Sequence, residues 1–130
     1  MPVTFQIDGN AGIVRTRCTG LVTFAEVIDH FRELAEDPAC PERLDVLLDV
    51  TGIASLPDPS QLRSVSVEID RLRHRVRFGN CAIVAGSDVV FGMMRMFEVF
   101  AAEHFHSIRV LRDLGESEAW LASHHPGNDR

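Results

Sequence analysis

The stretch of residues 44–52, Leu-Asp-Val-Leu-Leu-Asp-Val-Thr-Gly, constrains the fold more than any other part of this sequence. Its aliphatic centre is typical of a short strand that is covered on both faces. The pair Thr51-Gly52 then supplies turn-forming residues that end the strand. Because helical patterns lie on both sides of this stretch, we predict a middle strand of an α/β sheet, with three fully buried side chains: Val46, Leu48 and Val50.

Two further segments with alternating apolar residues precede this strand. Residues 3–7 read Val-Thr-Phe-Gln-Ile, and residues 13–19 alternate in the same way. The intervening residues 8–12, Asp-Gly-Asn-Ala-Gly, have the composition of a tight turn. The pattern therefore predicts an antiparallel hairpin at the start of the sequence.

Four segments combine a helix-start signal with apolar residues at helical spacing. The first two start at Thr23 and Asp58, which are both residue types that suit a helix N-cap. The third follows residues 86–88 and runs to about Phe105, and the fourth follows Asp113.

Short apolar runs at 81–85 and 108–111 predict two more buried strands, and Phe78-Gly79-Asn80 is expected to end the second helix before the first of them. The complete order is ββαβαβαβα. Short connections imply right-handed parallel crossovers, so we predict a five-stranded, mixed, mostly parallel sheet whose first strand is antiparallel at one edge. The length of 130 residues suits one α/β domain, 1–122, with a frayed tail at 123–130.

The charge and the cysteine content argue against several classes of function. The formal net charge of −6 argues against nucleic-acid binding. The thirteen basic residues are all arginine, so there is no lysine for a Schiff base. Cys18, Cys40 and Cys81 are widely spaced, which favours reduced thiols over a metal site. The first residues lack a signal-peptide pattern and the most apolar stretch, 89–102, is too short to span a bilayer, so we expect a cytoplasmic protein without a transmembrane segment.

No residue pattern in the sequence predicts catalysis, a bound metal or a cofactor. His104 and His106 are spaced so that their side chains diverge at a helix end, and no Gly-x-Ser-x-Gly sequence is present. Gly86-Ser87-Asp88 has the composition of a helix N-cap, although its backbone N–H groups could also face an anion. The arginine run at 71–77 complements the dipole of a helix C-terminus, and the alternative is a patch for an anionic partner or lipid headgroup.

The segment from Val89 to Phe100 is apolar almost all round, whereas a surface helix needs only an apolar stripe. One side could be covered by a second subunit, a lipid chain or a neighbouring helix. We predict a second copy of the chain, because symmetric dimers are the commonest assembly. Met93, Met96 or Phe100 is expected to contribute to the contact. Gly92, inside the helix, indicates close packing at that point.

Three parts of the sequence together resemble a known family. They are Leu-Leu-Asp-Val-Thr-Gly at 47–52, Cys-Ala-Ile-Val-Ala at 81–85, and Phe-Gly-Met-Met-Arg-Met-Phe-Glu at 91–98, the last followed by Val-Leu-Arg-Asp at 110–113 and Ala-Trp-Leu at 119–121. This combination resembles the bacterial SpoIIAA-like proteins, small stand-alone relatives of the STAS domain. The resemblance covers nearly the whole chain and implies a STAS-like fold, related in topology to the CRAL-TRIO lipid-binding domains.

The resemblance also implies a candidate regulatory site. STAS antagonists of anti-sigma factors carry a phosphorylatable serine near the start of the second helix, in an Asp-Ser-Ser-Gly-like setting. The corresponding region of this sequence is Pro57-Asp58-Pro59-Ser60-Gln61. Ser60 is therefore the candidate phosphosite, although its setting departs from the family's pattern.

The leading hypothesis for function is a non-enzymatic STAS-like domain that acts through protein–protein contact, as a homodimer. The alternative is a binding module for a small apolar or lipid-like ligand. Its pocket is expected at the carboxyl ends of the parallel strands, near Asp49, Thr51, Gly86 and Ser87.

Overall fold

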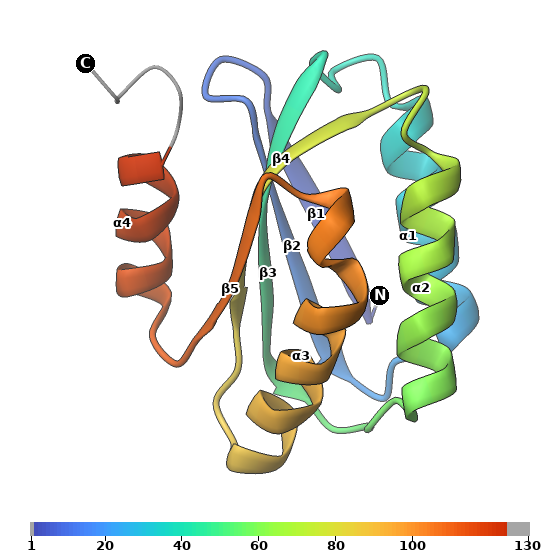
Figure 1. Ribbon diagram of the computed structural model, residues 1–130, viewed down its shortest axis with the longest axis vertical. Helices are drawn as coiled ribbons and strands as arrows, with labels where there is room; N and C mark the ends of the chain where they lie inside the picture. The colour runs from blue at the N-terminus through green and yellow to red at the C-terminus, as the bar shows by residue number, and fades with distance from the viewer. Residues whose placement is uncertain (1, 125–130) are drawn as a thin grey trace.

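The computed structural model describes residues 2–124, which form one five-stranded sheet and four α-helices (Figure 1). The strands are β1 (Val3–Asp8), β2 (Ile13–Gly20), β3 (Arg43–Ile53), β4 (Arg77–Val84) and β5 (Ser107–Leu111). The helices are α1 (Phe24–Glu36), α2 (Pro59–Arg71), α3 (Asp88–Ala101) and α4 (Leu114–His124), and a short 3-10 helix, η1 (Ala102–His104), follows α3. Within this described part of the chain, no helix is long and apolar enough to cross a bilayer.

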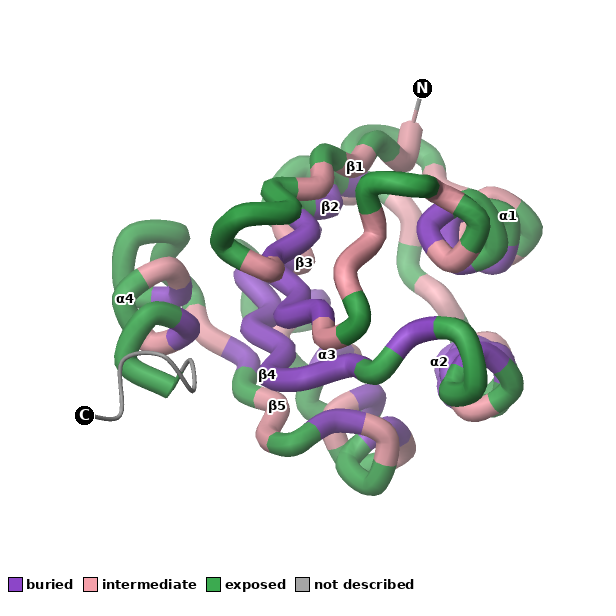
Figure 2. Tube along the Cα trace, turned by 90° about the horizontal axis from the view of Figure 1, so that it is seen from above, coloured by how far each residue is buried: buried purple, intermediate pink, exposed green. Residues whose placement is uncertain are grey.

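The strands lie in the order β1-β2-β3-β4-β5, with β1 antiparallel to β2 and every other neighbouring pair parallel. This arrangement confirms the predicted ββαβαβαβα order, the antiparallel edge strand and the central place of β3. Successive right-handed crossovers that advance in one direction place their helices on one face of a sheet. Accordingly, α1, α2 and α3 cover one face and α4 covers the other (Figures 1 and 2).

The continuous apolar runs of the middle strands are explained by this layering, because successive side chains of a strand point to opposite faces. On the face of α1, α2 and α3, the strands contribute Val14, Val46, Val50 and Ile83 to the larger core. On the opposite face they contribute Ile13, Leu47, Ala82 and Val84, which pack with Leu121 of α4. Both faces of β3 and β4 are therefore apolar, and Figure 2 shows burial concentrated along these two strands.

The prediction of three fully buried side chains in β3 is wrong for one of them. Val46 and Val50 are buried, with exposed fractions of 5% and 3%, whereas Leu48 is only half-buried. All three side chains line one cavity, and among them Leu48 is the one that packed atoms cover only in part.

The helix starts agree with the local sequence signals. Thr23 caps α1, where its hydroxyl accepts from the Glu26 N–H at 3.2 Å and the Glu26 carboxylate accepts from the Thr23 N–H at 2.9 Å. Asp58 and Gln61 form the equivalent capping box at α2. Such reciprocal bonds satisfy backbone donors that the first helical turn leaves unpaired.

The predicted break of the second helix at Phe78-Gly79-Asn80 is wrong. Helix α2 ends at Arg71, and these three residues belong to β4. A buried polar contact explains why turn-forming residue types occur inside a strand: the Asp45 carboxylate of β3 accepts from the Asn80 N–H at 2.8 Å and lies 3.2 Å from Arg43 Nη1. Gly79 leaves room for these two side chains, since a Cβ there would lie 2.5 Å from Arg43 Cζ.

Two other helix boundaries differ from the sequence-based predictions. Helix α3 ends at Ala101 rather than near Phe105, and η1 continues the turn to His104. Helix α4 includes residues 123 and 124, which the sequence analysis assigned to the tail. The rest of the expected tail, 125–130, lies outside the described residues.

We predict that Gly79→Ala destabilises the protein by about 1–3 kcal/mol, the usual cost of forcing extra volume into a packed site. The matched control is Gly92→Ala, in α3, where a Cβ meets no atom within 4 Å. The control should raise stability by up to about 1 kcal/mol, because alanine favours a helix over glycine. Urea unfolding of the three proteins measures both effects, and equal stability of Gly79→Ala and the wild type would contradict the packing argument.

Candidate ligand-binding site

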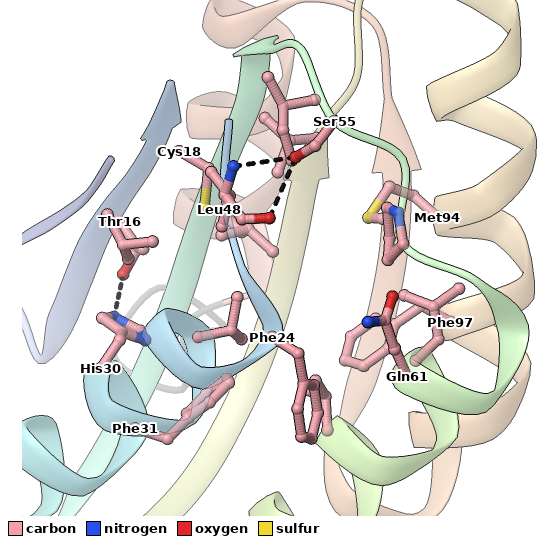
Figure 3. Close-up of a pocket in the computed structure, with 18 of the residues that line it drawn as sticks. Thr16, Cys18, Phe24, His30, Phe31, Leu48, Ser55, Gln61, Met94 and Phe97 are labelled. Atoms are coloured by element: carbon pink, nitrogen blue, oxygen red, sulfur yellow. Dashed lines mark hydrogen bonds between the residues drawn. The ribbon is translucent and has the colours of Figure 1, made fainter. Parts of the chain in front are cut away.

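A cavity of about 360 Å³ lies between the sheet and helices α1, α2 and α3, which cover one of its faces (Figure 3). Its sheet side is built from medium-sized or small residues, among them Thr16 and Cys18 of β2 and Cys81 of β4. Its helix side includes the aromatic rings of Phe24 and Phe31. Small side chains on the strands leave space beneath the helices, and the rings surround that space without filling it.

The cavity reaches the surface at the carboxyl ends of β2 and β3. Residues of the two loops that follow these strands line it, and one of them, Leu56, is 57% exposed. Ser55 joins the two loops, because its hydroxyl accepts from the Val22 N–H at 2.9 Å and donates to the Val22 carbonyl at 3.1 Å (Figure 3). The mouth of the cavity is therefore bridged by one side chain.

His30 is the most deeply placed polar side chain on the helix side of the cavity. It is 5% exposed, and its Nε2 lies 2.9 Å from Thr16 Oγ1 (Figure 3). Phe5 and Phe31 contact its ring edge-on. Burial lowers the pKa of His30 to about 4, so the imidazole is neutral at physiological pH. The cavity wall thus carries a neutral hydrogen-bonded pair, His30 and Thr16.

Sequence reasoning did not single out His30, although one signal was present. His30 follows Val27 by three residues and precedes Leu34 by four, so it lies on the apolar face of α1. A polar residue at such a position either has a partner in the core or faces a cavity. In this structure His30 does both.

Two of the three free cysteines, Cys18 and Cys81, also line the cavity. Burial, with a smaller contribution from the negative charge of Asp49, raises the pKa of Cys18 to about 11. Burial also raises the pKa of Cys81. Both side chains are therefore neutral thiols, which behave as small apolar groups rather than as nucleophiles.

The residues predicted to form a pocket lie at the expected edge of the sheet, but they do not line this cavity. Asp49 points to the face opposite Leu48, where its carboxylate accepts from the Thr51 hydroxyl at 2.6 Å. A Cβ on Gly86 would lie 3.9 Å from Thr51 Cβ, so these residues are neighbours. Ser87 caps α3 by accepting from the Val90 N–H at 3.2 Å. The mouth of this cavity lies one strand nearer β1, between the β2 and β3 loops, and a ligand site at Asp49, Thr51, Gly86 and Ser87 stays a prediction.

Ser60, the candidate phosphosite, is an exposed residue in the first turn of α2. Its hydroxyl donates to Asp58 Oδ1 at 2.6 Å. Phosphorylation of Ser60, which mass spectrometry of residues 58–66 would detect, stays a prediction.

Helix α3 exposes less apolar surface than its sequence indicates. Met93 and Phe100 are half-buried against the core, and among the predicted contact residues Met96 is the most exposed. Two arginines lie over aromatic rings, Arg63 over Phe100 with Cζ 4.8 Å from the ring centroid, and Arg112 in the same way over Phe91. Arginine covers such rings with its planar head, so part of the apparent surplus is shielded within the domain.

Gly92 does not pack closely, contrary to the prediction. A Cβ at this position meets no atom within 4 Å, and the residue is exposed. It belongs to the outward row of α3, whose other members are Val89, Met96 and Val99. This row is the apolar surface that remains uncovered on the helix.

Three arginines of the run at 71–77 form surface ion pairs, and His104 lies near two carboxylates. Arg71, Arg73 and Arg75 lie 3.7 Å from Glu68, 3.3 Å from Asp70 and 3.8 Å from Glu36, respectively. His104 lies between Asp70 and Glu103, at 3.7 and 3.8 Å. Across residues 2–124, no group of three or more His, Cys, Asp or Glu side chains is placed to hold a metal ion.

The architecture is that of a SpoIIAA-like fold, as the sequence resemblance implied. A solved structure with which it agrees is that of an uncharacterised protein of the DUF3478 family from Shewanella loihica PV-4, described as having a SpoIIAA-like fold. The two agree with a TM-score of 0.60 over 92% of this chain and 91% of that chain, at 13% sequence identity. At that identity the likeness shows the fold alone. Comparisons with models of known protein families and with curated proteins give no match.

The lowered pKa of His30 predicts a specific dependence of stability on pH. The unfolded chain takes up a proton at His30 near pH 6.5 and the folded chain only near pH 4, so stability is fully present above pH 6.5 and falls as the pH is lowered through this window. His30→Gln should reduce this fall by about 3 kcal/mol in the free energy of unfolding. Urea unfolding at several pH values measures the difference.

The control for this experiment is His74→Gln, which makes the same substitution at an exposed position outside the cavity. This variant retains His30, so its stability should fall with pH as the wild type's does. Parallel pH profiles for the wild type and His30→Gln would show that His30 is not held neutral by the fold.

Proposed function

We propose that the protein binds a small apolar ligand in the cavity between the sheet and helices α1, α2 and α3. The observation that carries this proposal is the cavity itself, whose volume of about 360 Å³ lies within the usual range for ligand sites. Protein interiors are close-packed and contain few voids larger than a water molecule. This cavity has room for on the order of ten water-sized groups, so it is far larger than a packing defect.

The energetic cost of an empty cavity favours an occupant. An empty apolar cavity lacks the dispersion contacts that fill a normal core, and each unfilled volume lowers stability. For a cavity of this size the loss is on the order of several kcal/mol, a large fraction of the stability of a small domain. An apolar ligand restores these contacts, and it buries apolar surface of its own.

The chemistry of the lining supports binding rather than catalysis. A thiol reacts as its thiolate, and the raised pKa values of Cys18 and Cys81 disfavour that form. His30, with a pKa of about 4, is a poor match to general acid–base work at neutral pH. The polar groups of the wall stabilise the structure through hydrogen bonds within the protein. One of them can also form a hydrogen bond to a ligand and orient it.

A bulky side chain in the cavity should abolish binding without unfolding the protein. Val27, on the cavity wall of α1, is the position to change, and Val27→Trp should weaken binding of the neutral fluorophore N-phenylnaphthylamine by at least about tenfold. Fluorescence titration measures this, because the probe brightens in an apolar environment.

The control is Val67→Trp, the same substitution at a 49% exposed position of α2 that does not line the cavity. It should bind the probe as the wild type does. If Val27→Trp is folded by circular dichroism and binds the probe with unchanged affinity, the cavity is not the binding site.

A second candidate function, homodimer formation, rests on the outward row of α3. Val89 and Val99 in this row are 60% and 75% exposed, and Met96 is 36% exposed. Arg95 and Glu98 pair at 3.0 Å beside the row, so a charged pair borders the apolar surface. An apolar patch that contains methionine, bordered by a polar rim that contains arginine, has the composition of an interface.

Sedimentation should show a dimer at about 100 μM, and Met96→Glu should convert it to a folded monomer, since an unpaired charge would be buried in the contact. Leu114→Glu, at a 47% exposed position of α4, is the control and should leave the dimer intact. A wild-type monomer at that concentration would exclude this candidate and leave ligand binding as the proposed function.

A further inference from the structure

We infer that the cavity selects uncharged ligands and rejects anionic amphiphiles such as fatty acids, an inference that rests on the proposed function. The ligand class is a hydrocarbon-like molecule with at most one neutral hydrogen-bonding group, such as a medium-chain alcohol or ketone. The observations that carry it are the absence of any arginine among the described residues that line the cavity and the presence of carboxylates at its mouth.

The residues that line the described cavity include no arginine, aspartate or glutamate. An anionic headgroup therefore finds no fixed positive charge inside, and all arginines of the described chain lie outside the lining. A buried carboxylate without a cationic partner is strongly unfavourable, because the low-dielectric interior cannot replace its hydration. The protein as a whole also gives an anionic ligand no nonspecific electrostatic attraction, since its formal net charge is −6.

The polar groups of the lining are neutral and are bonded to one another or to the backbone. His30 and Thr16 bond each other at 2.9 Å, and Ser55 bonds both backbone groups of Val22. Each of these side chains has further hydrogen-bonding capacity, so one of them can accept or donate a single bond to a hydroxyl or carbonyl group. This is the polarity that an alcohol or ketone needs.

The mouth of the cavity is flanked by the amino ends of α1 and α2, which would ordinarily attract an anion. In this protein both ends are already occupied by the chain's own carboxylates. Glu26 accepts from the N–H and the hydroxyl of Thr23, a lining residue, at 2.9 and 2.8 Å. Asp58 accepts from the N–H of Gln61, another lining residue, at 2.9 Å.

The hydrogen bonds from Thr23 lower the pKa of Glu26, and those from the Ser60 hydroxyl and then the Gln61 N–H lower the pKa of Asp58, so both carboxyl groups are ionised at neutral pH. A ligand whose chain occupies the cavity and whose charged head remains at the mouth therefore meets two negative charges, at two helix ends whose capping donors are already bonded within the chain. Both placements of an anionic headgroup, inside the cavity or at its mouth, are unfavourable.

The test is competition of decanol and decanoate against N-phenylnaphthylamine at neutral pH. The two competitors share a chain of a size that suits the cavity and differ in the charge of the head. Decanol should displace the probe at a concentration at least tenfold lower than decanoate. The double variant Glu26→Gln/Asp58→Asn should improve binding of decanoate several-fold and leave that of decanol unchanged, because both replacements retain the capping oxygen.

The matched control is Asp29→Asn/Glu33→Gln, which removes the same two charges from exposed positions of α1 that do not line the cavity. It should leave both affinities at their wild-type values. Equal displacement by decanol and decanoate, or tighter binding of decanoate, would overturn the inference while leaving the cavity as an apolar binding site. Failure of the probe to bind at all would overturn the proposed function itself, and this inference with it.

Discussion

Right-handed crossovers carry the chain from β2 to β3, from β3 to β4 and from β4 to β5 in one direction, so the three connecting helices share one face of the sheet. The other face would then be open to water along β3 and β4, where apolar side chains also point outward. Helix α4, folding back after β5, covers that face with Leu121 at its centre. The handedness of the connections therefore determines both the asymmetry of the two layers and the need for the last helix.

The sequence was informative wherever the physical cause of the structure is local. The N-caps Thr23 and Asp58 lie next to the helices that they start, so they could be recognised directly. The strand positions of Gly79 and Asn80 could not, because the reason for them is the Asp45 carboxylate, which comes from a different strand and is 35 residues from Asn80 in sequence. Taken by themselves, a glycine and an asparagine indicate a turn.

The cavity opens at the edge of the sheet where the sequence predicts a pocket, but residues other than those named for that pocket line it. Expecting a ligand at the carboxyl ends of the strands follows from parallel topology, and the mouth does lie at that edge. Which face of the sheet holds the space depends on side-chain volumes contributed by every strand from β1 to β4 and by α1, α2 and α3, and no single window of sequence contains that sum. Asp49 illustrates the difficulty, since one step along the strand from Leu48 places a side chain on the opposite face.

The Ser55 bridge bears on the rate of ligand exchange as well as on the structure of the cavity mouth. The capping boxes keep the first turns of α1 and α2 intact by themselves, so the two loops can separate without unwinding either helix. Beyond the backbone hydrogen bond from the Ala54 N–H to the Gly20 carbonyl, the loops are held together by two hydrogen bonds of the Ser55 hydroxyl, each of which water can replace. The residence time of an occupant would then be governed by how often that bridge opens, whereas its affinity would be governed by the walls. In such an arrangement exchange can become faster or slower through a single loop residue while the equilibrium between free and occupied protein stays the same.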